Sequence, residues 1–184
     1  MSASERFPIT VRPGVADDLA AIAAFDHSYS TDYVWQMDHR DEDNQINVTF
    51  RQVRLPRSVR VAYPRDVETL AGEWKLRRLF IVAESRGEVH GYLTVADSAE
   101  SGTGWVSEFA VGRRMRRQGL GTVLITSAVH WARKAKLQRL VVEAQSKNYP
   151  AISFCQKHGF AFCGYNDRYF ANQDIALFFG TFLK

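Results

Sequence analysis

A short basic segment that contains glycine has the residue types and spacing of an anion-binding site. Arg116-Arg117-Gln118-Gly119-Leu120-Gly121 follows an apolar stretch typical of a strand and precedes an amphipathic stretch typical of a helix. The two glycines remove β-carbons that would keep a ligand away from the backbone. The first N–H groups of a helix also lack acceptors within the helix, so they can bind an anion. The segment therefore predicts a site for a phosphate or pyrophosphate group.

The same residues exclude two common phosphate loops. A Walker loop would end in Gly-Lys-Ser/Thr, and a dinucleotide loop would read Gly-x-Gly-x-x-Gly, and the segment contains neither. A tight turn with solvated arginines is the alternative that these residues leave open by themselves.

The segment resembles the signature of the GNAT superfamily of acetyl-CoA-dependent N-acetyltransferases, Arg/Gln-x-x-Gly-x-Gly/Ala, through Arg116, Gly119 and Gly121. A second pattern of that family is Asn-x-x-Ala followed by an aromatic residue and then Gly-Phe. It is present as Asn148, Ala151, Phe154, Gly159 and Phe160. The opening Ile9-Thr10-Val11-Arg12-Pro13, followed by Asp18-Leu19, resembles the family's first strand and helix. The resemblance covers nearly the whole chain, with residues 30–75 covered poorly.

Within the superfamily, the C-terminal third is most similar to streptothricin acetyltransferases. The similar stretches are Glu143-Ala144-Gln145 through Asn148, residues 154–160, and Asn172-Gln173-Asp174-Ile175-Ala176-Leu177-Phe178. The resemblance implies an acceptor amine of streptothricin or polyamine type and a role in antibiotic resistance. Acetylation of a protein N-terminus or of a lysine is the alternative within the class.

The resemblance implies acetyl-CoA as cosubstrate and no metal. The family binds the pantetheine arm of CoA along the backbone of one strand, and the main-chain N–H of Val111 is expected to stabilise the oxyanion there. The expected acetyl-CoA contacts are Phe109, Ala110, Val111, Arg116, Arg117, Gln118, Gly119, Leu120, Gly121, Thr122, Asn148 and Phe154.

Acetyl transfer requires a neutral amine, although an amine like that of lysine has a pKa near 10.4 and is mostly protonated at pH 7. A general base therefore helps the reaction. Glu108 and Glu143 are the two carboxylates best placed for it, and ribosomal-protein acetyltransferases of the superfamily use a glutamate that matches Glu143. The alternative for each is an exposed carboxylate at a strand end or one that is paired with an arginine.

Cys155 departs from the family pattern. The tyrosine that often protonates the CoA thiolate in this family falls at this position. A thiol with a reference pKa of about 8.5 can donate such a proton, but a cysteine that only packs against the core is the other interpretation. Tyr149, Tyr165, Tyr169 or a water are further candidates for the proton donor.

Alternating elements are predicted around these residues. The hydrophobic periodicity indicates a strand near 9–11, a helix near 18–25, a broken or bent strand within 46–63, a hairpin of 79–83 with 92–95, a strand at 105–111, a helix from 120 to about 136, a strand at 140–144, a helix at 151–157, and strands at 160–165 and 171–182. The class is mixed α/β. The resemblance implies one GNAT-like domain over 1–184, with a mostly antiparallel central sheet, a splayed parallel pair of strands and flanking helices. The aromatic and acidic segment 29–43 lies where the superfamily has its substrate loops. It is expected either to form such a loop or to place core aromatics beside a solvated acidic turn.

Composition limits the remaining function classes. The chain has 184 residues, 46% of them hydrophobic and 24% charged, as in a globular domain. It shows no signal peptide or membrane span, and its two cysteines indicate neither a disulfide framework nor a zinc site, so a cytoplasmic protein is predicted. The net charge of +4 reflects arginine runs within 51–65 and 113–117. These runs leave a nucleic-acid-binding module as a disfavoured rival, because no nucleic-acid motif accompanies them. A non-catalytic acyl-CoA-binding protein and a homodimer also stay open.

Overall fold

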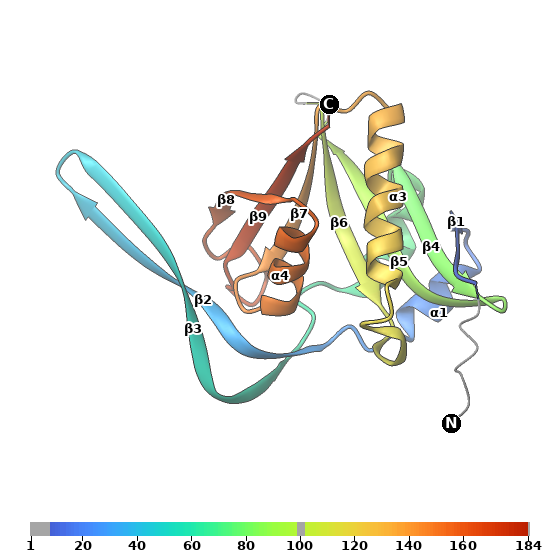
Figure 1. Cartoon of the computed structure of the whole chain (residues 1–184), viewed down its shortest axis with the longest axis horizontal. Helices are drawn as coiled ribbons and strands as arrows, with labels where there is room; N and C mark the ends of the chain where they lie inside the picture. Colours follow the sequence, from blue (N-terminus) through green and yellow to red (C-terminus); the bar gives the residue numbers. More distant parts are fainter. Residues whose placement is uncertain (1–7, 99–101, 184) are drawn as a thin grey trace. The chain divides into compact units, whose positions relative to one another are not determined.

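The computed structural model describes residues 8–98 and 102–183 (Figure 1). Its strands are β1 (Thr10–Pro13), β2 (Tyr29–Glu42), β3 (Gln45–Val61), β4 (Leu79–Ser85), β5 (Glu88–Ser98), β6 (Thr103–Val111), β7 (Arg139–Gln145), β8 (Ala161–Asn166) and β9 (Ala176–Phe182). Its helices are α1 (Asp18–Ala23), α2 (Val67–Glu73), α3 (Leu120–Lys134) and α4 (Tyr149–Lys157), with the short 3-10 helices η1 (Trp74–Leu76) and η2 (Arg113–Met115).

Hydrogen bonding orders seven strands as β1-β4-β5-β6-β7-β9-β8, while β2 and β3 form a separate two-stranded sheet. The described residues group into two compact units. The first comprises residues 8–27, 66–98, 102–142 and 180–183, and the second comprises Ser28–Arg65 and Glu143–Phe179. Strands β7 and β9 contribute residues to both units.

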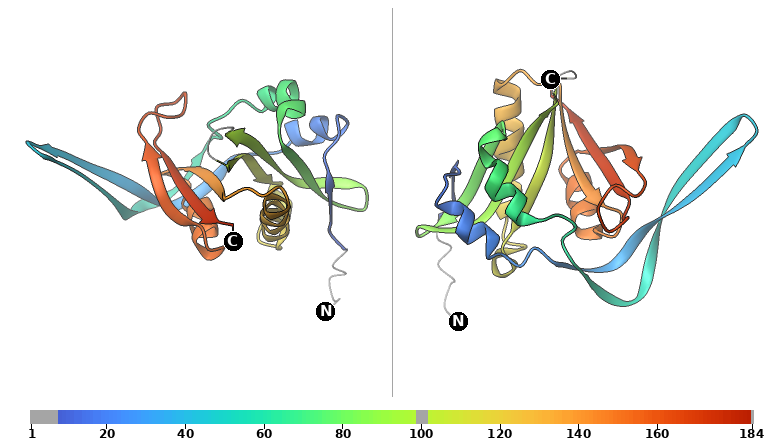
Figure 2. Two further views of the ribbon diagram at one scale, coloured as in Figure 1. Left: turned by 90° about the horizontal axis from the view of Figure 1, so that it is seen from above. Right: turned by 180° about the vertical axis from the view of Figure 1, so that it is seen from behind.

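The sheet of the first unit is antiparallel from β1 through β4 and β5 to β6, and β6 pairs with β7 in parallel. Residues 80–83 of β4 and 91–95 of β5 are buried throughout because helices cover both faces of these strands. Figure 2 shows α3 on one face of these strands and α1 with α2 on the other. Ile22, Leu70, Phe80, Val82 and Tyr92 form a buried cluster under α1 and α2. This mixed α/β fold, with its mostly antiparallel sheet and one parallel pair, confirms the predicted fold class.

Strand β6 extends beyond the residues that pair with β7. The parallel register runs from Thr103, opposite Arg139, to Val106, opposite Val142. On its other edge β6 stays paired with β5 as far as Val111. The β7 ladder therefore ends five residues before β6 does, and we call this stretch of β6, which β7 does not pair, its open edge.

Helix α3 follows this strand and is the clearest helix of the sequence. Its inward face is buried at Leu120, Leu124, Ile125, Ala128 and Ala132, a spacing of three to four residues that matches the helical repeat. Basic side chains occupy its last turn, where they interact favourably with the negative end of the helix dipole. The helix predicted from residue 120 is confirmed, and it ends two residues before the expected position.

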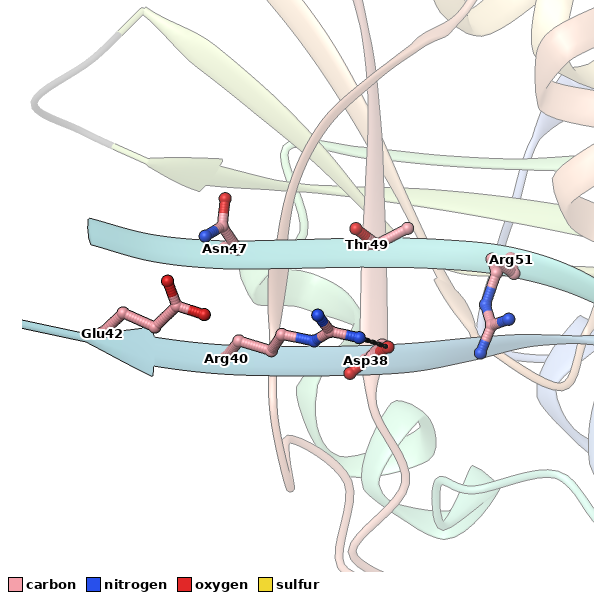
Figure 3. A pocket seen from close by; sticks show the side chains of 6 residues that line it. All are labelled: Asp38, Arg40, Glu42, Asn47, Thr49 and Arg51. Atoms are coloured by element: carbon pink, nitrogen blue, oxygen red, sulfur yellow. Dashed lines mark ion pairs between the residues drawn. The ribbon is translucent and has the colours of Figure 1, made fainter.

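The second unit contains α4, β8 and the long hairpin of β2 and β3. The hairpin pairs Met37 with Phe50 on one face and Asp38 with Thr49 on the other. Its apolar face packs on β8, where the ring of Phe50 lies 5.7 Å from that of Phe162. The opposite face is polar and lines a shallow depression, shown in Figure 3 with side chains Asp38, Arg40, Glu42, Asn47, Thr49 and Arg51.

One expectation for this part of the chain was wrong, and one helix was missed. The segment 29–43 forms strand β2 rather than a substrate loop, and its acidic residues alternate between the two faces of the hairpin instead of gathering into one wall. Helix α2 was not predicted. It begins after Asp66, whose side chain accepts a hydrogen bond from the Glu68 N–H at 2.9 Å. Within the part of the chain that the structure describes, no helix is long and apolar enough to cross a membrane.

Candidate active site

The open edge of β6 presents backbone groups from alternate residues. The Gly112 N–H donates to the His90 carbonyl at 2.8 Å, which directs the polar groups of Gly112 and Ala110 toward β5. By the alternation of an antiparallel ladder, Phe109 and Val111 direct their N–H and C=O groups to the opposite edge, beyond the end of the β7 pairing. An extended amide chain can bind this edge as an additional strand.

The loop that follows β6 curves its backbone around the start of α3. Arg117 has φ +64° and Gly119 has φ +95°, so two residues within three lie in the left-handed region. Such a conformation turns successive N–H groups to one side and forms an anion-binding concavity. The Val123 N–H donates to the Gly119 carbonyl at 3.1 Å, which is the first hydrogen bond of α3. The N–H groups of Leu120 and Gly121 therefore have no acceptor within the helix.

The two arginines of the motif have different surroundings. Arg116 is half-buried, and its guanidinium donates from Nε to the Val111 carbonyl at 2.9 Å and from Nη2 to the Asp26 carbonyl at 2.7 Å. Arg117 is exposed, and Gln118 donates its side-chain amide to the Arg114 carbonyl at 3.0 Å. The Arg116 side chain thus joins two backbone segments, whereas the Arg117 side chain faces solvent.

Glu108 is buried in the first unit, and it is not an exposed carboxylate at a strand end. It lies opposite Thr94 in the β5–β6 ladder and shares a sheet face with Tyr92. The Tyr92 hydroxyl bonds His27 Nε2 at 3.0 Å, and His27 Nδ1 lies 2.9 Å from the Phe25 carbonyl. Since a carbonyl only accepts, Nδ1 carries the proton and Nε2 accepts from Tyr92. Burial raises the pKa of Tyr92, and the nearby Glu108 raises it further. Burial lowers the pKa of His27.

Glu143 in the second unit is held on both carboxylate oxygens. Arg65 forms an ion pair with Oε1, and the Tyr169 hydroxyl donates to Oε2 at 3.0 Å. The Glu143 side chain is 7% exposed, and the Arg65 guanidinium also lies over the ring of Phe170, 5.7 Å from its centre. Sequence reasoning named Glu143 and Tyr169 separately and anticipated an arginine partner for the carboxylate, but it did not identify Arg65. No local signal links Arg65 to a carboxylate 78 residues later.

A buried polar network supports the loop that carries Tyr169. The Asp174 carboxylate accepts from Gln145 at 2.8 Å, from Asn172 at 3.0 Å and from Lys147. The Asp174 carbonyl accepts the Tyr169 N–H at 3.1 Å. Because the carboxylate is buried and bonded on both oxygens, the loop has a defined position relative to β7.

Helix α4 explains part of the second sequence pattern. The Asn148 side chain accepts the Ala151 N–H at 3.1 Å, which is the N-cap bond expected for Asn-x-x at a helix start. The ring of Phe154 lies 4.3 Å from that of His158. Cys155 is 2% exposed, and burial raises the pKa of its thiol to about 12. The thiol therefore stays protonated at neutral pH and packs in the core.

Comparisons with known proteins agree with this geometry. Residues 23–160, which are most of the chain, match the acetyltransferase (GNAT) family. The chain is 28% identical to the streptothricin acetyltransferase of Streptomyces lavendulae over 177 residues, covering 94% of this chain and 86% of that protein. It is 29% identical to streptothricin acetyltransferase A of Bacillus subtilis (strain 168) over 82 residues, covering 42% and 47% of the two chains.

Solved structures share the fold. A nourseothricin acetyltransferase superposes with a TM-score of 0.81 at 23% identity, covering 96% of this chain and 99% of that one. A Bacillus anthracis str. Ames protein, solved in complex with acetyl coenzyme A, superposes with a TM-score of 0.78 at 18% identity and the same coverage. At these identities the superpositions support the fold alone. From the family match across most of its length, the chain belongs to the acetyltransferase (GNAT) family and is an acyltransferase.

Proposed function

We propose that this protein transfers the acetyl group of acetyl-CoA to a primary amine of a streptothricin-type antibiotic. The observation that carries the proposal is the open edge of β6, which leads directly into the left-handed loop before α3. An extended pantetheine arm and a pyrophosphate are joined in CoA, and these two backbone features follow one another in the same order. The choice of antibiotic rests on the Streptomyces lavendulae relative, which matches over nearly the whole chain.

The proposed cosubstrate contacts come mainly from the backbone. The polar groups of Phe109 would bind the pantetheine amides. The Val111 carbonyl accepts from Arg116, and the Val111 N–H would stabilise the oxyanion formed when the amine attacks the thioester. The N–H groups of Leu120 and Gly121 would bind the pyrophosphate, with the exposed Arg117 adding charge. Ala110, Gln118, Gly119, Thr122, Asn148 and Phe154 complete the proposed contacts.

Glu143 is the carboxylate that we propose as the general base. An ionised carboxylate has about four acceptor positions, and Arg65 and Tyr169 occupy two of them. The other acceptor positions of the carboxylate would take the proton from the substrate amine. Glu108 is the second candidate, but it lies buried on the sheet face that also holds Tyr92.

The test uses the purified chain of 184 residues with acetyl-CoA and three acceptors: streptothricin, spermidine and a peptide with a free N-terminus. We expect an acetylated streptothricin by mass spectrometry, stoichiometric release of CoA thiol, and a kcat/KM for streptothricin at least 100-fold above that of the other two acceptors. Preference for the peptide would favour protein acetylation instead. No transfer to streptothricin would overturn the proposal.

Paired variants test the base. Glu143→Gln should lower kcat/KM by about 10² to 10⁴, with the acetyl-CoA affinity retained, because a general base contributes about that factor. Glu108→Gln should lower it less. Equal rates of wild type and Glu143→Gln across the pH range would show that the amine loses its proton by another route.

Other expectations from the sequence stay predictions. They are a single catalytic domain over residues 1–184, a cytoplasmic location, catalysis without a metal, and a homodimer as one of the open oligomeric states.

A further inference from the structure

The apolar face of the hairpin of β2 and β3 continues beyond the element that packs on it. Phe50 lies against Phe162 of β8, with ring centres 5.7 Å apart. Toward the turn, Val48 and Ile46 occupy the next two positions on the same face of β3, because alternate residues of a strand point to one side. Ile46 is 70% exposed and Phe162 is 51% exposed. These four residues form one row, which we call the apolar strip.

The outer part of the hairpin, residues 38–49, is a two-stranded ribbon. Figure 1 shows it extending away from α4, β8 and β9 of the same unit. Two strands alone are marginally stable in water, and a ribbon gains stability when its apolar face packs against another element. Single exposed apolar residues are ordinary, whereas contiguous ones mark an interaction surface. The apolar strip therefore indicates a surface that binds a partner.

Charge is divided unequally along the hairpin. The outer part carries four acids and one arginine, which are Asp38, Asp41, Glu42, Asp43 and Arg40. The inner part, residues 29–37 and 50–61, carries one acid and four exposed arginines, which are Asp32, Arg51, Arg54, Arg57 and Arg60. The hairpin as a whole therefore has no net charge, but its outer part is acidic and its inner part is basic.

This division of charge distinguishes between classes of partner. A polyanion such as a nucleic acid would be attracted by the inner part of the hairpin and repelled by the outer part, and a polycation would be repelled by the inner part. A second copy of the hairpin that lies antiparallel to the first places each acidic part beside a basic part. A two-fold axis creates this arrangement, because each contact that one copy makes is repeated by the other. The charges therefore favour a second copy of this chain.

We propose that the hairpin of β2 and β3 is a dimerisation arm, which packs antiparallel on the same arm of a second copy. The two-fold axis passes near Val48. Ile46 of each copy then packs on Phe162 of the other, and the acidic turn at Asp43 approaches Arg54 of the other copy. Every residue of this interface belongs to the second unit. Because the arm is narrow, the interface is small, and we expect a dissociation constant on the order of 10 μM.

The first experiment measures the oligomeric state of the 184-residue chain by sedimentation velocity, from about 1 μM to about 200 μM. We expect mostly monomers at the lowest concentration and mostly dimers at the highest. Ile46→Thr should raise the dissociation constant at least tenfold, because the two-fold axis places this residue in the interface twice. Leu76→Thr is the matched control, since Leu76 is 80% exposed in the first unit, and it should change the dissociation constant by less than twofold. Thermal unfolding at the lowest concentration checks that each variant is folded.

The second experiment tests the charges. Arg51→Glu/Arg54→Glu makes the inner part of the hairpin acidic, and Glu42→Arg/Asp43→Arg makes the outer part basic. Each of these variants by itself should stay monomeric at about 200 μM, because like charges then meet at both ends of the interface. A mixture of the two variants should form dimers, because opposite charges meet at both ends. About 0.5 M salt should weaken both the wild-type dimer and the mixed dimer, since the exposed charges are screened.

Three results would overturn the inference: a wild type that stays monomeric throughout the range, a dimer that neither Ile46→Thr nor the charge variants weaken, and a mixture that stays monomeric. A single-stranded oligonucleotide and anionic lipid vesicles test other occupants of the arm. A monomeric wild type that binds either probe, and loses this binding in Arg51→Glu/Arg54→Glu, would also overturn the inference and would assign the arm to an anionic partner. None of these measurements depends on acetyl transfer, so the inference and the proposed function can fail separately.

Discussion

Replacing Arg116 and Arg117 one at a time by methionine should show that the two arginines have different roles, although the sequence predicted the same role for both. Both arginines were expected to face the CoA phosphates. In the structure, the Arg116 guanidinium bonds the Val111 and Asp26 carbonyls, whereas Arg117 is exposed. We therefore expect Arg116→Met to reduce stability and Arg117→Met to reduce acetyl-CoA affinity.

The magnitudes follow from the contacts. Arg116→Met removes two charge-assisted hydrogen bonds, each worth about 1.5 to 3 kcal/mol when desolvated. Since Arg116 is only half-buried and water can reach the site, we expect a total loss of about 2 kcal/mol, after discounting for solvent screening. For a chain of this size that corresponds to a fall in Tm of about 4 to 8 °C. Arg117→Met should change the unfolding free energy by less than about 0.5 kcal/mol, as for most surface substitutions.

Thermal unfolding and calorimetric titration with acetyl-CoA, at low and high salt, measure both effects. Arg117→Met should weaken binding by about tenfold or more at low salt and by less at high salt, because exposed charges are screened. Arg133→Met, at the far end of α3, is the control for the loss of one positive charge. The reasoning fails if Arg116→Met keeps its Tm within about 1 °C and loses acetyl-CoA affinity with the same salt dependence as Arg117→Met.

Three further variants test separate parts of the structure. Gly119→Val should abolish acetyl-CoA binding in calorimetric titration, because the side chain would stand where the pyrophosphate is expected. A β-carbon at this position meets no atom of the protein within 4 Å. The substitution should still lower the free energy of unfolding by about 1 to 3 kcal/mol, because the φ of +95° is strained for valine. Cys155→Ala should keep kcat within tenfold of wild type and lower Tm through the small cavity it leaves, and a larger loss of kcat would identify the thiol as a proton donor. Asp18→Asn should remove a pH dependence of unfolding. The hydrogen bonds from Arg12 hold the pKa of Asp18 below its ordinary value, so the stability they add is present above about pH 4 and is lost as the pH falls through the native pKa. Denaturant titrations from pH 6 to pH 2 should therefore show a steeper fall for wild type than for Asp18→Asn.

Local patterns determined much of the first unit. The hairpin of β4 and β5 was predicted because two apolar runs flank a turn at Arg86 and Gly87, both of which have positive φ. Helix α3 was predicted because its apolar residues repeat at helical spacing after a glycine. These signals lie within a few residues of one another, so a single sequence contains them.

Strand β3 was predicted within 46–63, but β2 and its pairing with β3 were missed because their signal is not local. Apolar and polar residues alternate along β2 from Trp35 to Asp38, but the partners that make one face apolar, such as Phe50, lie on β3, and the face is covered by β8, more than 100 residues later. In the sequence, a strand whose burial depends on a distant element shows the same mixed composition as a loop.

Part of the candidate site was likewise predicted from local patterns, and part was decided by the tertiary structure. The sequence by itself determined the family and predicted the anion-binding loop and the two candidate glutamates, because these depend on residue types at short spacings. Only the tertiary structure decided that Arg116 bonds carbonyls and that Glu143 lies between Arg65 and Tyr169. Hydrogen-bond partners are chosen by distance in space, and the chain brings these residues together across separations of up to 90 positions.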